Sequence, residues 1–160
     1  EQFLELIQEN TGIIHKVCHM YCHSAHDRQD LFQEIVAQLW KAFPKFRNEA
    51  RISTWMYRIA LNTAISDFRK QQRRISIAGE LPHSSTDIPE YSYREQQERL
   101  AMLQQAVNYL SDIEKAIVIL YLEEKNYQEM EEVLGISQPT LRVKMNRIKE
   151  KLRRHIGQAE

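Results

Sequence analysis

The chain has 160 residues, of which 42% are hydrophobic and 28% charged, and its 22 basic side chains balance its 22 acidic ones. Four glycines and four prolines leave few tight turns, so we predict an all-α fold with one moderate core or two small ones. Two cysteines exclude a disulfide framework and no apolar run reaches the about 20 residues of a membrane span, so we expect a cytoplasmic protein without such a span.

The first 75 residues are predicted to form one helical domain. Apolar residues from Phe3 to Tyr21 mark helical segments with a break near Asn10. A further helix is predicted from about Ile52 to Arg74, capped by Ser53 or Asn48, with Trp55 in its core stripe. Between them lies a strong helix ending at Pro44, whose apolar stripe comprises Leu31, Phe32, Ile35, Val36, Leu39, Trp40 and Phe43.

Residues 15–26, HKVCHMYCHSAH, hold four histidines and both cysteines. Projected on one helix over 14–26, the cysteines fall on or beside the apolar stripe and the histidines form a polar band next to it. One straight helix cannot arrange four ligands around zinc, and no second Cys/His cluster exists to complete a site. We therefore predict core cysteines and no metal; a histidine band that becomes charged below about pH 6.5 and alters partner binding is the alternative left open.

Residues 76–92, SIAGELPHSSTDIPEYS, lack any period and are rich in turn formers, which predicts a flexible linker before a second small domain over 93–160. Helicity resumes near Leu100, and Ser111 with Glu114 forms a predicted capping box. The apolar run at 117–122, IVILYL, could pass for a buried strand, but its capping box and helical neighbours favour a buried helix.

Residues 126–154 carry a helix-turn-helix pattern. Gly135 supplies a residue suited to positive φ at the turn, Ser137 is a candidate cap, and Pro139 falls in the first turn of the next helix. Apolar residues of that helix share one face, and the opposite face carries the cations, amide and aliphatic that can read base edges in a major groove: Pro139, Arg142, Val143, Asn146 and Arg147. Candidates for phosphate contacts are Lys144, Lys149, Lys151, Arg153 and Arg154.

Charge is distributed in blocks although its sum is zero. Residues 41–75 hold nine basic and two acidic side chains, and residues 135–156 hold seven and one. Residues 111–134 hold seven acidic and two basic side chains. Two basic blocks predict two contacts with a polyanion. We also expect the acidic 111–134 helices to fold toward the basic first domain, so that the free protein binds DNA poorly.

Two stretches together resemble the extracytoplasmic-function (ECF) subgroup of RNA polymerase sigma factors, over roughly residues 3–155. The first domain contributes DLFQEIVAQLW and FPKFRNEARISTWMYRIALNTAISDFRK, and the second contributes YLSDIEKAIVILYLEEKNYQEMEEVLGISQPTLRVKMNRIKEKLR. The resemblance implies promoter-specific transcription initiation. Its implied partners are promoter DNA, an anti-sigma factor, and bacterial core RNA polymerase through the clamp coiled coil of the largest subunit and the flap.

The resemblance also implies three sets of site residues. A polymerase-binding set comprises Asp30, Leu31, Gln33 and Glu34. The promoter-melting loop at 46–52 and the −10 reading helix at 54–74 supply Phe46, Arg47, Arg58, Asn62, Arg69, Lys70, Arg73 and Arg74. The −35 set comprises Gln138, Thr140, Arg142, Val143, Asn146, Arg147 and Lys149.

Some positions depart from the family pattern. Glu131 replaces a small residue in the first helix of the motif, Pro139 replaces a glycine, and Val143 replaces a serine. We expect Glu131 to widen the packing of the two helices, and the loss of a hydroxyl donor at Val143 puts the −35 sequence in doubt.

Two other classes of function compete with this interpretation. A stand-alone helix-turn-helix regulator would bind duplex DNA as a homodimer, but it leaves the first domain without a role. A metal or redox enzyme centred on residues 15–26 would contain stoichiometric metal. The sequence offers no nucleophile with its base and no phosphate-binding glycine loop, so we predict no catalytic residues and no cofactor.

Overall fold

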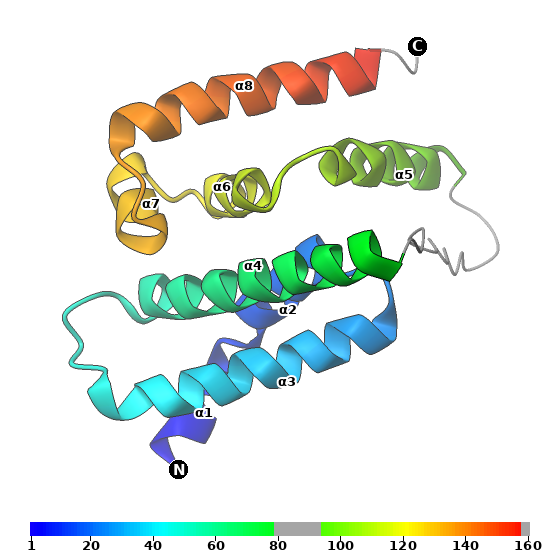
Figure 1. The fold of residues 1–160 in the computed structure, drawn as a ribbon. Helices are drawn as coiled ribbons and strands as arrows, with labels where there is room; N and C mark the ends of the chain where they lie inside the picture. Colours follow the sequence, from blue (N-terminus) through cyan, green and yellow to red (C-terminus); the bar gives the residue numbers. More distant parts are fainter. Residues whose placement is uncertain (79–93, 158–160) are drawn as a thin grey trace.

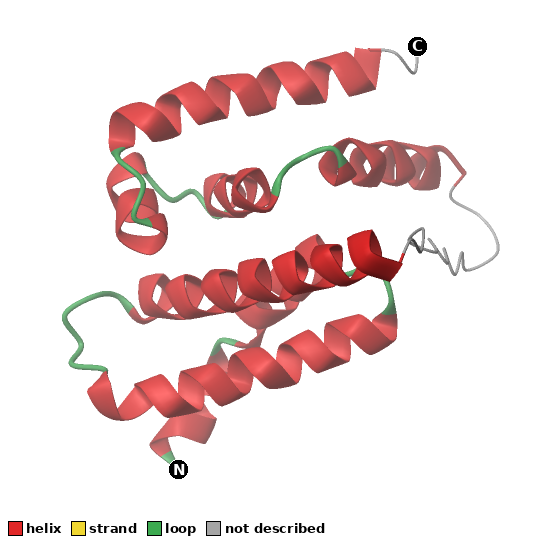
Figure 2. Cartoon of the chain, viewed as in Figure 1, coloured by secondary structure: helices red, strands yellow, loops and turns green. Residues whose placement is uncertain are grey.

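Helix α4 (Ile52–Ala78) lies at the centre of the computed structural model, between the helices that precede it and those that follow it (Figure 1). The structure describes residues 1–78 and 94–157. Within these ranges every regular element is a helix (Figure 2), so the predicted all-α fold is confirmed. No helix among them combines the length and the apolar character needed to cross a bilayer.

The segments before α4 form a small helical layer. The predicted break near Asn10 is confirmed, because one helix ends and the next begins on either side of it. The single helix predicted over 14–26 is wrong: the chain leaves helical geometry after Tyr21, and the Ser24 side chain accepts a hydrogen bond from the Asp27 N–H at 3.0 Å to start a new helix. The elements are α1 (Gln2–Glu9), α2 (Thr11–Tyr21), α3 (Ala25–Ala42) and the 3₁₀ helix η1 (Phe43–Lys45).

Both ends of α4 differ from the prediction. Ser53 lies inside the helix, and Asn48 lies in the preceding turn with φ of 56°, so neither residue caps it. Asparagine tolerates this left-handed conformation better than most residues. At its other end α4 runs to Ala78, beyond the domain boundary predicted at residue 75. The rest of the predicted linker, 79–92, lies outside the described residues.

The C-terminal domain contains four helices. The capping box of Ser111 and Glu114 is confirmed, and the run at 117–122 is helical as predicted. Its last two residues, Tyr121 and Leu122, are nevertheless exposed. The helices are α5 (Arg94–Asn108), α6 (Asp112–Leu122), α7 (Tyr127–Leu134) and α8 (Gln138–Gly157).

The core of the N-terminal domain is built by α2, α3 and α4. Cys18 and Cys22 are buried in it, which confirms their prediction as small core residues. Burial raises the pKa of Cys18 to about 11 and, with help from the Cys18 sulfur, the pKa of Cys22 to about 12, so both thiols stay protonated. The buried hydrophobic side chains of α3 and α4 are Leu31, Ile35, Leu39, Met56, Tyr57, Ala60, Leu61, Ala64 and Ile65.

The two domains pack on each other. Helix α6 contacts α2 and α4, and α7 contacts α4, so the buried side chains of both domains form one continuous cluster. The acidic segment 111–134 therefore lies against the basic first domain, as the charge pattern predicts.

Glu114 joins α6 to α8. The Lys151 ammonium donates to its two carboxylate oxygens at 2.6 and 3.0 Å, and the Ser111 N–H donates to the same group at 3.2 Å. Burial alone would raise the pKa of Glu114, but these hydrogen bonds more than offset it and hold the pKa below its ordinary value. The charged form is thus the one that stabilises the fold.

We predict that Glu114→Gln lowers the free energy of unfolding by about 1 kcal/mol at neutral pH. Because the pKa of Glu114 is lower in the folded protein than in the unfolded chain, its ionised form stabilises the fold at pH values above the unfolded-state pKa of about 4.5. This stabilisation is lost as the pH falls below that value and through the folded-state pKa. Urea titrations followed by circular dichroism at several pH values measure the difference. Glu150→Gln, on the exposed side of α8, is the matched control and should change little; an equal loss in both variants would contradict the prediction.

Candidate nucleic-acid interface

Helices α7 and α8 form the predicted helix-turn-helix. Asn126 and Glu129 build a second capping box at the start of α7. Gly135 ends the helix with φ of 70° and ψ of 20°, the left-handed conformation that glycine adopts without strain. Ser137 precedes α8, and its hydroxyl lies 2.9 Å from that of Thr140.

Helix α8 presents the predicted −35 set on its outer side. Leu141, Met145 and Ile148 are buried on the inner side. Six members of the set are exposed and Gln138 is half-buried at the helix start, so the structure brings all seven to one end and face of α8. A shallow hollow on this face is lined by Pro139, Thr140, Val143, Lys144 and Arg147.

Two tyrosines orient cations of this face, and sequence reasoning missed both. The Arg142 guanidinium lies 5.3 Å from the ring centroid of Tyr127, and the Lys149 ammonium lies 5.5 Å from that of Tyr121. Such contacts hold a cation over an aromatic face without removing it from solvent. The signal in the sequence was an aromatic residue near the end of α6 and another at the start of α7.

Two expectations for this domain are wrong. Lys151 does not serve as a free phosphate ligand, because Glu114 engages its ammonium. Glu131 is exposed on α7, so it does not lie between the helices and does not widen their packing.

Helix α4 carries the predicted −10 set along one side. Arg58, Asn62, Arg69 and Arg73 follow each other by four, seven and four residues and therefore share a face. All four are exposed, as are Lys70 and Arg74 beside them. Arg69 is not free, because its Nε lies 2.5 Å from an oxygen of Asp112.

The loop before α4 is anchored by an aromatic pair. The rings of Phe46 and Trp55 have centroids 4.6 Å apart and planes inclined by 34°. Trp55 is half-buried with one side against the core, so its prediction as a core residue is correct only for that side. The neighbouring Arg47 is exposed.

The predicted polymerase-binding set lies on α3. Asp30, Gln33 and Glu34 are exposed, and the Glu34 carboxylate accepts a hydrogen bond from Gln38 at 2.8 Å. Leu31 has only 2% of its surface exposed and packs in the core, so it cannot offer contact surface. Leu31 is therefore removed from the predicted contact set. Its burial holds α3 in place, and α3 carries the other three residues.

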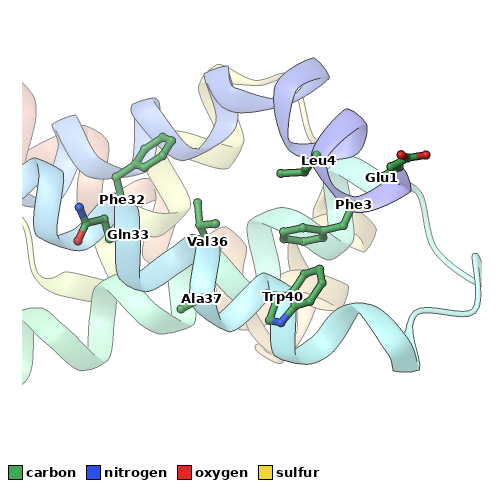
Figure 3. Close-up of a pocket in the computed structure, with 8 residues that line it drawn as sticks. All are labelled: Glu1, Phe3, Leu4, Phe32, Gln33, Val36, Ala37 and Trp40. Carbon is green, nitrogen blue, oxygen red and sulfur yellow. The ribbon is translucent and has the colours of Figure 1, made fainter.

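An apolar groove that sequence reasoning missed runs beside these residues (Figure 3). Leu4 of α1 and Val36 of α3 flank it, and Trp40 lies along it with 59% of its surface exposed. The Phe3 ring supports Trp40 edge-on at a centroid distance of 5.0 Å. The available signal was the width of the stripe on α3: Leu31, Ile35 and Leu39 are buried, Phe32 and Val36 are only partly buried, and Trp40 is exposed.

The four histidines are exposed and lie on two helices and the turn between them. The His15 ring lies 5.0 Å from that of Phe32, and His26 Nε2 lies 3.4 Å from an Asp30 oxygen. Partial burial, Arg28 and His15 lower the pKa of His19, so it stays neutral at physiological pH. In the part of the chain that is described, no three His, Cys, Asp or Glu side chains come together around a possible metal ion.

Comparison with known proteins agrees with this arrangement. The family model for Sigma-70 region 2 matches residues 6–74, and that for Sigma-70 region 4 matches residues 100–152. Over 98% of the chain and 89% of the relative, the sequence is 23% identical to the ECF RNA polymerase sigma factor SigW of Bacillus subtilis. The chain belongs to the ECF sigma factors. Promoter-specific transcription initiation with RNA polymerase, the predicted function, is thereby confirmed.

Solved structures share the fold of this ECF sigma factor. The sigma factor RpoE of Bartonella quintana, in complex with the anti-sigma factor NepR, superposes with a TM-score of 0.78 at 18% identity over 98% of this chain and 97% of that one. CnrH, in complex with the cytosolic domain of CnrY, gives a TM-score of 0.71 at 17% identity over 99% of this chain and 89% of that one.

The turn of this sigma factor gives a test of the motif's geometry. We predict that Gly135→Ala lowers the free energy of unfolding by about 1 kcal/mol, because alanine is strained at this φ. No atom lies within 4 Å of an added Cβ, so the effect arises from the backbone alone. Gly135→Asn should lose less, since asparagine tolerates the left-handed region. Chemical denaturation of the parent protein and the two variants measures their free energies of unfolding. Equal losses of stability in both variants would refute the backbone explanation.

Proposed function

We propose that this ECF sigma factor works in the cytoplasm as a non-catalytic subunit of RNA polymerase, with three separate surfaces. Helix α8 reads the −35 element, α4 with its preceding loop holds the −10 strand, and the groove of α1 and α3 docks on the polymerase. The observation that carries the proposal is the outer face of α8, where cations, an amide and an aliphatic side chain are exposed together.

The chemistry of α8 fits duplex reading. Arg142 and Arg147 can each bond a guanine through two parallel hydrogen bonds, and Asn146 can do the same with adenine. Val143 is half-exposed between them and suits the methyl group of thymine. Thr140 and Lys149 lie at the edges of this face, where phosphates run.

The chemistry of α4 fits a single strand. Arg58, Lys70, Arg73 and Arg74 can neutralise successive phosphates, and Asn62 stands in the same face as a base-reading amide. Phe46 and Trp55 form a tilted aromatic pair beside Arg47, and an unpaired base could displace one ring from the other, since stacking contributes about 1–3 kcal/mol per base.

The groove fits a helical partner. Its apolar lining includes the carboxylate of Glu1, which precedes α1, and α3 also carries the exposed carboxylates Asp30 and Glu34. An amphipathic helix with basic edges is complementary to this surface. We assign this partner to the clamp coiled coil of the largest polymerase subunit. The flap would fall to the C-terminal domain, where Met102 and Leu103 of α5 are exposed.

An anti-sigma factor is proposed as a further partner. The RpoE structure above was solved with the anti-sigma factor NepR bound, and its fold matches nearly the whole of this chain. The proposal is supported by the similarity between the folds of the two sigma factors.

Charge reversal on α8 tests the −35 assignment. We predict that Arg147→Glu lowers transcription from a selected promoter by more than about ten-fold while core polymerase binding stays intact, because a bidentate base contact is replaced by repulsion from the phosphates. The promoter is first obtained by reconstituting the protein with core polymerase and selecting transcribed sequences from a random library. Arg147→Lys keeps the positive charge but lacks the planar guanidinium that makes two parallel hydrogen bonds. Its level of transcription should lie between those of the parent protein and Arg147→Glu. Parallel loss of transcription and polymerase binding would indicate a structural role only.

Truncation in the groove tests the polymerase assignment. We predict that Trp40→Ala weakens binding to core RNA polymerase by about ten-fold, since exposed aromatic side chains in apolar grooves are frequent anchors of interfaces. Fluorescence anisotropy of the labelled protein titrated with core enzyme measures the affinity. Leu122→Ala removes an equally exposed apolar side chain outside the groove and should leave the affinity unchanged. Equal affinities for both variants would refute the groove as the docking site.

A further inference from the structure

The shallow hollow on the outer face of α8 lies between two neighbouring rows of side chains. One row consists of Pro139, Val143 and Arg147 and the next of Thr140 and Lys144, in both cases at steps of four residues. Lys144 is half-buried and the other four side chains are exposed. The hollow is therefore part of the surface that we assign to the −35 duplex.

The N-terminal end of the hollow is apolar. Pro139 has no N–H group, and neither its ring nor the Val143 side chain carries a hydrogen-bonding atom. The Thr140 hydroxyl lies 2.9 Å from the Ser137 hydroxyl, so it already has a partner at the start of the helix. The side chains at this end therefore recognise a neighbouring molecule by apolar contact.

The other end of the hollow is basic. Lys144 and Arg147 lie there, and among the described residues neither side chain takes part in an ion pair. At 1.5 Å per residue, Val143 and Arg147 are about 6 Å apart along the helix, whereas base pairs are stacked about 3.4 Å apart. The apolar contact and the cation therefore suit two groups that lie within about two base pairs of each other.

Thymine is the base whose edge matches this arrangement. In the major groove it presents a C5-methyl group, whereas cytosine and adenine present an amino group. An apolar wall gains from excluding water around a methyl group, but it leaves an amino group without its hydrogen bond to water. Arg147 at the basic end suits the O6 and N7 atoms of a nearby guanine.

We propose that Pro139 and Val143 determine specificity by reading the C5-methyl group of one thymine in the −35 element. This role rests on the proposed −35 function of α8 and names the chemical group that its apolar residues recognise. Cytosine and adenine are rejected at this position because their amino groups would lose water against Pro139 and Val143. The thymine lies within about two base pairs of the guanine that Arg147 contacts.

The test removes the methyl group from the DNA and its contact from the protein. Each thymine in the −35 element of the selected promoter is replaced in turn by uracil, which differs from thymine only in lacking the methyl group. Holoenzyme is assembled from core polymerase and the full chain, as the parent protein, Pro139→Ser, Val143→Ser or Ile156→Ser. Ile156 provides the matched control, because it is an aliphatic residue of α8 outside the hollow with 47% of its surface exposed, against 50% for Val143.

The initial rate of transcription at limiting holoenzyme is measured on each template, after circular dichroism has confirmed that every variant is folded. At one −35 position we expect uracil to lower the rate about four-fold for the parent protein and for Ile156→Ser, the effect of one buried methyl group. For Val143→Ser the same replacement should change the rate less than about two-fold, and Pro139→Ser should lie between these values.

An equal effect of uracil on Val143→Ser and Ile156→Ser would overturn the proposal, as would a −35 element without thymine or one in which uracil has no effect at any position. A response of Pro139→Ser equal to that of the parent protein would overturn the assignment of Pro139. Arg147→Glu is measured on the same templates. If it lowers transcription while uracil does not, methyl reading alone is refuted; if it does not lower transcription, the −35 function of α8 is refuted as well.

Discussion

The burial of helix α4 from two sides is the constraint on which the rest of the structure depends. Ala60, Leu61 and Ala64 are fully buried, and their small or flexible side chains let α2 and α3 pack closely against the helix. Helices α6 and α7 also pack against α4. Tyr57 is buried on the same helix, and burial and the neighbouring Glu123 carboxylate raise its pKa. The exposed side chains of α4 are left on its remaining face, where Arg58, Asn62, Arg69 and Arg73 follow one another by four, seven and four residues.

This constraint makes the two surfaces that we propose for DNA binding unequal. In Figure 1, α8 lies on the far side of α5 and α6 from the N-terminal domain, and its Arg142 and Lys149 contact Tyr127 and Tyr121 of the same domain. The face of α4 borders the other domain, and Arg69 is already paired. The acidic segment 111–134 therefore lies against the basic face of one surface, while the other belongs to the C-terminal domain itself.

Most of the fold follows from local signals. The left-handed Gly135, the capping box of Ser111 and Glu114, and the period of the α8 apolar face each depend on residues within one or two turns, and each was predictable from the sequence. The exposed −35 residues follow from the same period, because burying Leu141 and Met145 forces Arg142 and Asn146 outward.

The features that could not be predicted from the sequence, the apolar groove and the ion pairs between domains, depend on packing between distant segments. The stripe on α3 is two residues wide, and the packing of neighbouring helices decides which residues are buried: Leu31 lies in the core, whereas Trp40 lines a groove with Phe3 and Leu4 of α1. Lys16 pairs with Glu123 across 107 residues, and Arg69 pairs with Asp112 across 43. Charge blocks predicted that the domains approach each other, but no spacing rule selects individual partners over such separations. The unexpected helix break after Tyr21 has a local cause, the cap of Ser24, which the strong histidine pattern obscured.

The buried thiols of α2 have a practical consequence for studying domain motion. Cys18 and Cys22 are shielded from solvent and hold their protons up to alkaline pH, whereas maleimides react with exposed thiolates. A single cysteine introduced on the outer side of each domain would therefore take up a fluorophore selectively in the otherwise native chain. The molecule is thus suited to distance measurements by energy transfer without removal of its own cysteines.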